Sequence, residues 1–362
     1  MEGRCVKHRP FYSNLEICYT MLKIAIVGYG FMGKTHLAAW RKRRGAKVVA
    51  VCDVNLAQLT AKNLGNVPEA KQTVELGAEV RVWEDVDAML AEGGLDVIDI
   101  TLPTPLHAEV ATKALAAGCH VLCEKPMALT LAECDRMLAA AKRSGKVLLI
   151  AQCVRFFPAY LKLAELVRSG RYGKVVAANF DRFMAVPKWS PKGACWLLDE
   201  SKSGGLYVDA HIHDADYIVS LFGLPKRVSS HANRDGRGFA NHLSTFYDYG
   251  DGKVVTSGCS FAAADSLTFD ASAKVFLEKA TIYLGGKDAA PLLVYPEGGK
   301  PFSPKLATAT GYEAEVAYFQ RLVEGRSQPT ILTAEDARTA LKLVLSEKQS
   351  DKTQRPVAIR GA

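Results

Sequence analysis

The sequence lacks several features that would place it in common classes of protein. None of its apolar runs approaches the roughly 18 residues needed to cross a bilayer, so we expect no membrane partner. It also lacks the nucleophile elbow of many hydrolases and the lysine-containing phosphate loop of many kinases. With 49% hydrophobic and 23% charged residues, its composition is that of a globular chain. A length of 362 residues predicts two domains, each able to bury a core.

The nine cysteines include no Cys-x-x-Cys pair, and their number is odd. In a chain of this length, such a pattern favours buried, reduced thiols over a disulfide framework or a zinc knuckle. We therefore expect a cytoplasmic protein.

The formal net charge of +8 comes from basic residues that are spread thinly along the chain. The one dense run is Arg41 to Arg44, at the end of an expected helix, where cations meet the negative end of the helix dipole. We interpret this run as a solvated helix terminus and expect no nucleic-acid partner.

Residues 1–20 precede a second methionine, Met21, after which a strand pattern begins at once. They contain no apolar segment with a small-residue cleavage site, so a secretory signal is not expected. Either translation starts at Met21 or the segment packs on the fold. We expect a functionally dispensable extension.

A glycine-rich turn follows the first expected strand. Gly28, Gly30 and Gly33 form the pattern G-x-G-x-x-G, and helical periodicity begins directly afterwards. The first glycine allows a tight turn, the second lets a pyrophosphate approach the backbone, and the third lets helix and strand pack closely. The start of the helix, with Phe31 and Met32, offers free N–H groups to the phosphates. The pattern predicts a dinucleotide site.

A second expected strand ends at Asp53, about 20 residues beyond the third glycine. A carboxylate at this position can accept hydrogen bonds from the adenosine ribose. Val54 and Asn55 follow, so no arginine stands there to neutralise a 2′-phosphate. The sequence therefore favours NAD over NADP.

Strand and helix patterns alternate as far as a strand that ends near Ala151. The expected helices between the later strands lie at 56–64, 85–91, 106–117 and 130–144. This alternation predicts an α/β fold in which residues 21–150 form a Rossmann domain with a doubly wound parallel sheet. Ligands bind at the carboxyl ends of such strands. The segments that fall there are the glycine turn, residues 101–107 and residues 124–126.

The pattern becomes β-rich after a helix expected at 158–169. Alternating runs typical of strands lie at 174–184, 226–234, 241–250, 253–261, 267–279 and 280–286. They predict that residues 151–362 form an α+β domain with a large, mainly antiparallel open sheet and helices on one face. The loop 183–203 is expected either to bind a sugar ring or simply to pack, through Lys188, Trp189, Lys192 and Trp196.

Residues 204–216 hold a further candidate site. Asp209 and His213 stand four residues apart, so in a helix both project from one face. A carboxylate one turn from an imidazole can orient it and stabilise its protonated form, which suits a general acid or base. His211 with the nearby Asp214 and Asp216 is also compatible with a metal site. His211 and His213 stand two residues apart and therefore point to different helix faces. We accordingly expect no metal, and we interpret His211 as a packing or pocket-lining residue.

Five ordered features make the chain resemble the glucose-fructose oxidoreductase, inositol dehydrogenase and rhizopine catabolism (Gfo/Idh/MocA) family of NAD(P)-dependent sugar dehydrogenases. They are GYGFMG with Asp53, TLPTPLH (101–107), CEKPMALT (123–130), GGLYVDAHIHDAD (204–216) and TAEDARTALKLVLSEKQS (333–350). The resemblance covers nearly everything from Met21 to the C-terminus. Relatives cover the open sheet by dimerising sheet to sheet, so the resemblance implies a homodimer or homotetramer.

The resemblance also implies a catalytic set of Lys125, Asp209 and His213. In that family the lysine of the E-K-P motif lies beside the nicotinamide and the reacting carbon. The segments at the strand ends add candidate cofactor contacts at Thr101, Pro103, Thr104, His107, Glu124 and Lys125. Candidate substrate contacts are Lys125, Arg155, Trp196, Asp209 and His213. A structural role between the domains is equally compatible with Arg155.

These observations predict an NAD(P)-dependent oxidoreductase that transfers a hydride between nicotinamide and a carbinol carbon of a sugar or polyol. His213 is expected to accept the hydroxyl proton, Asp209 to orient it and Lys125 to stabilise the alkoxide. Two alternatives remain open: an NAD-dependent glycosidase that uses transient oxidation, and a non-catalytic NAD-binding regulator. The sequence does not identify the sugar, because one fold serves many substrates.

Overall fold

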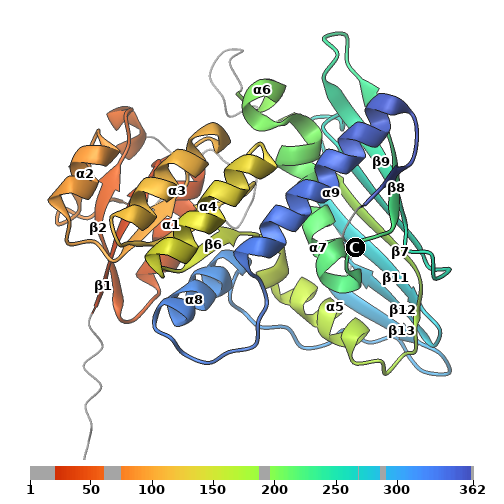
Figure 1. Cartoon of the computed structure of the whole chain (residues 1–362). Helices are drawn as coiled ribbons and strands as arrows, with labels where there is room; N and C mark the ends of the chain where they lie inside the picture. The colour runs from red at the N-terminus through yellow and green to blue at the C-terminus, as the bar shows by residue number, and fades with distance from the viewer. Residues whose placement is uncertain (1–20, 61–74, 187–195, 268, 286–290, 360–362) are drawn as a thin grey trace, which may run out of the picture.

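The computed structural model describes residues 21–60, 75–186, 196–267, 269–285 and 291–359. Their strands form two sheets, one of six strands and one of eight. In Figure 1 the six-stranded sheet and its helices lie on the left, and the eight-stranded sheet lies on the right.

The first sheet is wholly parallel and has the order β3-β2-β1-β4-β5-β6. Its strands are β1 (Leu22–Val27), β2 (Ala46–Cys52), β3 (Arg81–Trp83), β4 (Val97–Ile100), β5 (His120–Glu124) and β6 (Leu148–Ala151). Every residue of β4 and β6 is buried. Strands covered on both faces read as apolar runs. This is so for β6, and β4 follows it except for the buried Asp99. The predicted doubly wound parallel fold is confirmed.

Helices cross between these strands. They are α1 (Phe31–Arg41), α2 (Val86–Glu92), α3 (His107–Ala116) and α4 (Leu131–Ser144). A capping box starts α4, because Thr130 Oγ1 accepts from the N–H of Glu133 and the Glu133 carboxylate accepts from the N–H of Thr130. The helix expected at 56–64 is instead a short 3-10 helix, η1 (Leu56–Leu59), and residues 61–64 lie outside the described residues.

The second sheet has the order β13-β12-β11-β7-β10-β9-β8-β14. Its strands are β7 (Val175–Phe183), β8 (Arg227–Arg234), β9 (Ala240–Asp248), β10 (Val254–Ser260), β11 (Asp270–Leu277), β12 (Ala280–Leu284), β13 (Leu292–Pro296) and β14 (Val357–Ala358). All neighbours are antiparallel except β7 and β10, so the predicted mainly antiparallel sheet is confirmed. The sequence did not predict β13 or the two-residue edge strand β14.

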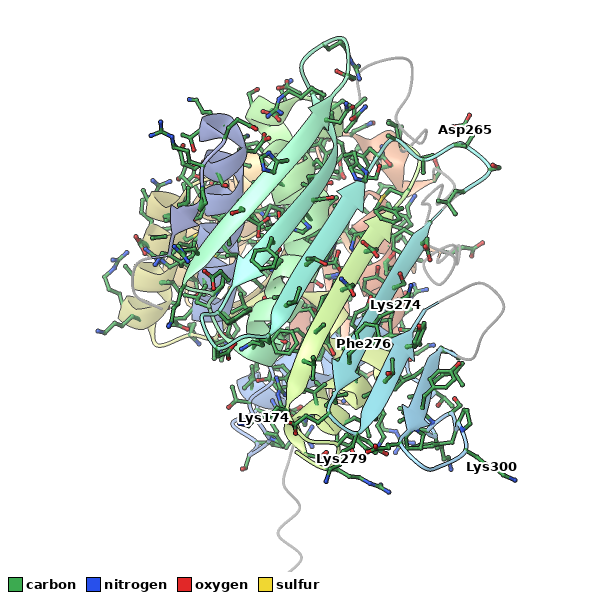
Figure 2. The ribbon with its side chains drawn as sticks, turned by 90° about the vertical axis from the view of Figure 1, so that its right-hand side faces the viewer. Lys174, Asp265, Lys274, Phe276, Lys279 and Lys300 are labelled. Atoms are coloured by element: carbon green, nitrogen blue, oxygen red, sulfur yellow. The ribbon has the colours of Figure 1, made fainter. Side chains whose placement is uncertain are left out.

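Three helices cover one face of the second sheet: α5 (Pro158–Arg168), α7 (Ile212–Phe222) and α9 (Ala334–Thr353) (Figure 1). Residues alternate along β9, where Thr245 and Tyr247 are buried and Phe246 between them is 42% exposed. Figure 2 looks onto the face that carries no helices, where Lys274 and Phe276 of β11 are labelled.

The sequence also did not predict α8 (Gly311–Val323), which packs on α1 through an edge-to-face contact between Trp40 and Phe319. Lys42 bonds Glu313 of α8, and Arg43 Nε donates to Gln320. The run Arg41 to Arg44 was expected to be a solvated helix end, but two of its side chains bond residues of α8. Its partners come from about 270 residues further along the chain, so local sequence could not identify them.

Six cysteines belong to the described residues, and all six are free and buried, as expected for reduced thiols. Within the part of the chain that the structure covers, no helix combines the length and apolarity needed to cross a bilayer.

Candidate functional site

The three glycines of the turn after β1 meet different surroundings. Gly28 has φ +94°, and a Cβ on it would lie 2.8 Å from the carbonyl oxygen of Thr101. A Cβ on Gly33 would lie 2.2 Å from the carbonyl oxygen of Gly28, so the chain requires glycine at both places. A Cβ on Gly30 would meet nothing within 4 Å. Open space at the second glycine is what a pyrophosphate needs.

Gly30 is also the N-cap of α1, and no side chain caps this end of the helix. The first N–H groups of the helix, on Phe31 and Met32 among others, are thus available to an anion. Phe31 and Met32 are half-buried at this turn.

Asp53 lies beside the same turn, directly after β2. Its Oδ2 accepts from the N–H of Tyr29 at 2.6 Å, and its Oδ1 accepts from the N–H of Asn55 at 2.8 Å. The side chain is still partly exposed, and each carboxylate oxygen keeps a further lone pair for a ribose hydroxyl. The turn, the helix end and Asp53 together fit a bound dinucleotide.

Residues 101–107 pack against this turn. Thr101 Oγ1 donates to the carbonyl oxygen of Gly28, while Pro103 and the buried Thr104 begin the 3-10 helix η3 (Thr104–Leu106). The ring nitrogens of His107 lie 2.9 Å from the carbonyl oxygen of Pro126 and 2.7 Å from that of Leu102. Because both nitrogens face backbone carbonyls, the ring of His107 is engaged within the protein, and its predicted contact with a cofactor stays a prediction. This histidine holds the segment in place, and burial lowers its pKa.

Glu124 belongs to a buried charged cluster. Its Oε1 lies 3.1 Å from His36 Nε2, and His36 Nδ1 lies 2.9 Å from Asp99 Oδ1. Burial lowers the pKa of His36, but Asp99 and Glu124 outweigh it and hold that pKa well above its usual value. Both ring nitrogens face carboxylates, which agrees with an imidazolium.

The contacts of Glu124 show a structural role, and its predicted contact with a cofactor stays a prediction. Its side chain is buried, and its Oε2 accepts from the N–H of Lys125 at 3.0 Å. Glu124 thus supports the backbone of the next residue from within the core. The sequence analysis did not identify His36 as its partner, because the two residues are 88 positions apart in the chain.

The structure brings Lys125 and Asp209 together, although 84 residues separate them. Lys125 follows β5 and is joined to Pro126 by a cis peptide bond. Its Nζ donates to the backbone carbonyl of Asp209 at 2.9 Å and lies 3.6 Å from Asp209 Oδ1. Both side chains keep a small exposed fraction, 18% and 13%, so they remain open to a small molecule.

Asp209 lies in a π-helix, η6 (Tyr207–His211), which leads directly into α7. Such turns are rare and often mark functional sites. His213 is the second residue of α7, and its Nδ1 is buried without a hydrogen-bond partner. Burial, followed by the charges of Lys125 and Arg182, holds the pKa of His213 well below its usual value.

The expected interaction between Asp209 and His213 is therefore corrected. The Asp209 carboxylate lies near Lys125, and the lowered pKa of His213 favours a neutral imidazole rather than a cation stabilised by Asp209. The chain forms a π-turn here rather than the regular α-helix that the expectation assumed, so the angle between the two side chains about the helix axis differs.

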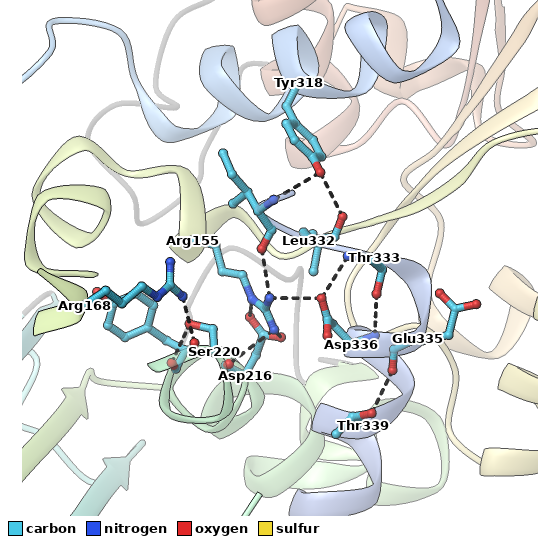
Figure 3. Close-up of polar contacts among 12 residues, drawn as sticks. Arg155, Arg168, Asp216, Ser220, Tyr318, Leu332, Thr333, Glu335, Asp336 and Thr339 are labelled. Carbon is cyan, nitrogen blue, oxygen red and sulfur yellow. Dashed lines mark hydrogen bonds and ion pairs between the residues drawn. The ribbon is translucent and has the colours of Figure 1, made fainter. Parts of the chain in front are cut away.

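Arg155 is only 5% exposed and is used entirely within the protein (Figure 3). Its Nε and Nη2 donate to the two oxygens of Asp216, each at 2.7 Å. Its Nη1 donates to the carbonyl oxygen of Ile331 and to Asp336. Of the two roles expected for Arg155, the structural one holds, and the substrate contact is corrected.

The remaining candidates are less informative. Trp196 begins the 3-10 helix η5 (Trp196–Leu198) and is half-buried, whereas Lys188, Trp189 and Lys192 lie outside the described residues. Asp214 forms a two-point pair with Arg182 at 2.7 and 3.0 Å, and Asp216 holds Arg155. No cluster of His, Cys, Asp and Glu that suits a metal ion occurs in the described ranges.

Two family models match the chain. Residues 22–152 match the oxidoreductase family with an NAD-binding Rossmann fold, GFO/IDH/MocA, and residues 160–283 match the GFO/IDH/MocA C-terminal domain. Together these matches cover well over half of the chain.

Curated relatives and solved structures agree with these matches. The chain is 33% identical over 216 residues to D-glucoside 3-dehydrogenase of Escherichia coli, which covers 58% of this chain and 57% of that protein. It is 29% identical over 249 residues to D-apiose dehydrogenase of Paraburkholderia graminis, covering 67% and 61%. The chain thus spans little more than half the length of these relatives.

An oxidoreductase from Agrobacterium radiobacter, in complex with NAD+, L-tartaric acid and magnesium, superposes with a TM-score of 0.76. The two are 21% identical, and the match covers 94% of this chain and 98% of that one, which shows a common fold. On the two family matches and this shared architecture, the chain belongs to the GFO/IDH/MocA family of NAD-binding oxidoreductases.

Proposed function

We propose that the protein is an NAD-dependent dehydrogenase that oxidises a carbinol carbon of a sugar or polyol. The observation that carries the proposal is the meeting of Lys125 Nζ with Asp209, close to His213, at the end of β5. The glycine turn opens at the same edge of the sheet. The names of the curated relatives, dehydrogenases of D-glucosides and D-apiose, support a sugar as substrate.

Bound NAD+ would supply the acceptor for the hydride. The free N–H groups at the start of α1 would hold its pyrophosphate, and Asp53 would accept from its ribose hydroxyls. His213, kept neutral by burial and by two nearby cations, is in the form that accepts the proton of the substrate hydroxyl. Lys125 has further N–H groups with which to stabilise the developing alkoxide. Asp209 in this scheme holds Lys125 rather than His213.

The preference for NAD over NADP is part of the proposal. The partly exposed carboxylate of Asp53 would repel a 2′-phosphate, and no basic side chain follows it in sequence. The free, buried cysteines support a cytoplasmic location. The first sheet is built by residues 22–151 and the second by residues 175–358, which supports a division of the chain near residue 150.

The open sheet supports a homodimer or homotetramer. Figure 2 presents the face without helices, on which Lys274 is labelled. By strand register the exposed aromatic residues Phe246, Tyr283 and Tyr295 lie on the same face as Lys274. Exposed aromatic side chains on an uncovered sheet face are typical of an interface between subunits. Light scattering coupled to size exclusion gives the oligomeric state, and a monomer at micromolar concentration would contradict this part of the proposal.

The experiment that tests the activity is Lys125→Met with a panel of polyols, aldoses, inositols and anhydrosugars, followed by NADH absorbance. We expect the wild type to reduce NAD+ with at least one compound, and Lys125→Met to abolish turnover while binding NADH normally. Lys113→Met removes a surface lysine paired with Asp87 and is the matched control. Retained turnover in Lys125→Met refutes the assignment, and cleavage of glycosides without net NADH favours the glycosidase.

A further inference from the structure

The π-helix that carries Asp209 has two different faces. Tyr207 and His211 are fully buried, at 1% and 0% exposure, and their polar atoms bond residues of α9 and the second sheet. Asp209 lies against Lys125. The charge of the same lysine contributes to the lowered pKa of His213, four residues further along the chain. One face of this segment is therefore anchored in the core, and the other presents the reactive groups.

The anchor at the end of the π-helix is His211. Its Nε2 lies 2.8 Å from Glu347 Oε2 in α9 and 3.1 Å from the hydroxyl of Tyr247 in β9. All three side chains are 0% exposed. The single hydrogen on Nε2 goes to the carboxylate, which is the stronger acceptor.

The anchor at the start of the π-helix joins the same buried network. The hydroxyls of Tyr207 and Ser230 lie 3.0 Å apart, and Thr245 Oγ1 donates to Ser230 Oγ at 2.8 Å. Thr245 also reaches Glu347 Oε2 at 3.4 Å. Both ends of the π-helix are thus connected through side chains to one carboxylate of α9.

We propose that His211 and Glu347 are positioning residues, whose bond holds the π-turn and thereby places Asp209 and His213 against Lys125. This inference rests on the proposed dehydrogenase function. A π-turn contains an extra residue, so its relaxation to a regular turn would change the angle between Asp209 and His213 about the helix axis. None of these hydrogen bonds involves Lys125 or the glycine turn, so the influence of the network on the site must pass through the backbone of the π-helix.

The test uses two small changes in the network and two matched changes outside it. Glu347→Gln keeps the shape and removes the charge, and Tyr247→Phe removes one hydroxyl. Glu315→Gln alters another fully buried glutamate, and Tyr217→Phe removes a buried hydroxyl that donates to the carbonyl oxygen of Tyr160. If Glu347→Gln does not fold, Tyr247→Phe still tests the inference.

We expect Glu347→Gln and Tyr247→Phe to lower kcat about 10- to 100-fold, because small displacements of catalytic groups have effects of that size. NADH affinity, measured by fluorescence, should stay at the wild-type value, and both control variants should keep the wild-type kcat. Wild-type kcat in folded Glu347→Gln and Tyr247→Phe would overturn the inference.

A second readout needs no substrate. NMR of ¹⁵N-histidine-labelled protein follows the titration of His213, identified by its loss in His213→Gln. Displacement of His213 from Lys125 should move its titration to higher pH in the two network variants and leave it unchanged in the controls. If the wild type oxidises no compound of the panel, the proposed function fails and this titration alone decides. An unchanged titration then overturns the positioning role.

Discussion

Gly30→Ala and Gly33→Ala should separate cofactor binding from folding. In Gly33→Ala the new Cβ would lie 2.2 Å from the carbonyl oxygen of Gly28, and backbone atoms cannot rotate aside as a flexible side chain can. Overpacking of this kind costs about 3 kcal/mol at the upper end of its usual range. Alanine recovers about 1 kcal/mol of helix propensity. The expected net loss is therefore about 2 kcal/mol of unfolding free energy.

Gly30→Ala should behave in the opposite way. Its φ of −77° is accessible to alanine, and the Cβ would enter open space. Stiffening of the unfolded chain contributes about 0.4–1 kcal/mol, and the poorer N-cap costs a similar amount. The two effects nearly cancel, so stability should stay near the wild-type value. The methyl group would occupy the space assigned to the pyrophosphate, so NADH should bind about tenfold more weakly or worse.

Thermal unfolding and NADH fluorescence titration of both variants measure these effects. Gly33→Ala should unfold roughly 4–8 °C below the wild type, and Gly30→Ala within about 2 °C of it. Wild-type NADH affinity in Gly30→Ala would show that the open space is not the phosphate site. Wild-type stability in Gly33→Ala would refute the packing argument.

Three further changes test other parts of the site. Asp53→Asn removes the charge beside the turn, so KM for NAD should rise about tenfold or more while KM for NADP falls. An unchanged ratio of the two KM values would contradict the role of Asp53. Burial, with the charge of Glu124 next, raises the pKa of Glu315 well above its usual value, so its contribution to stability is complete below about pH 4.5 and is lost as pH rises through the folded pKa. In urea titrations, the unfolding free energy of Glu315→Gln should therefore rise relative to that of the wild type as the pH increases. A difference between the two proteins that does not change with pH would refute this. Arg155→Met leaves the buried Asp216 unpaired and should lower the unfolding free energy by about 3–5 kcal/mol. Unchanged stability together with a raised KM for the substrate would instead support a contact between Arg155 and the substrate.

Local spacing was sufficient to predict the cofactor turn. Gly28, Gly30, Gly33 and Asp53 have requirements that arise within one strand–helix–strand unit, so the sequence places them without knowledge of the rest of the chain. The start of α8 carries a similar local signal that the sequence analysis did not use, since Thr310 Oγ1 accepts from the N–H of Glu313.

The partners of Arg155 and Glu124 come from distant parts of the chain. Arg155 is held by Asp216 and Asp336, which lie 61 and 181 residues further along the chain. Glu124 is held by His36 across the first sheet, and a sequence motif alone cannot distinguish such a buried pair from a ligand contact. The π-turn was hidden for another reason. Its residues satisfy the periodicity of an ordinary helix, so the pattern alone predicts a regular turn at Asp209.

The 2.9 Å bond from Lys125 Nζ to residue 209 ends on the main-chain oxygen and not on the side chain. Every amino acid at position 209 would offer that same acceptor. Substitution of Asp209 would therefore change the side chain that faces Lys125 and leave the acceptor of this hydrogen bond in place. The hydrogen bond that links the two halves of the protein thus depends on the path of the backbone and not on the identity of the side chain at position 209.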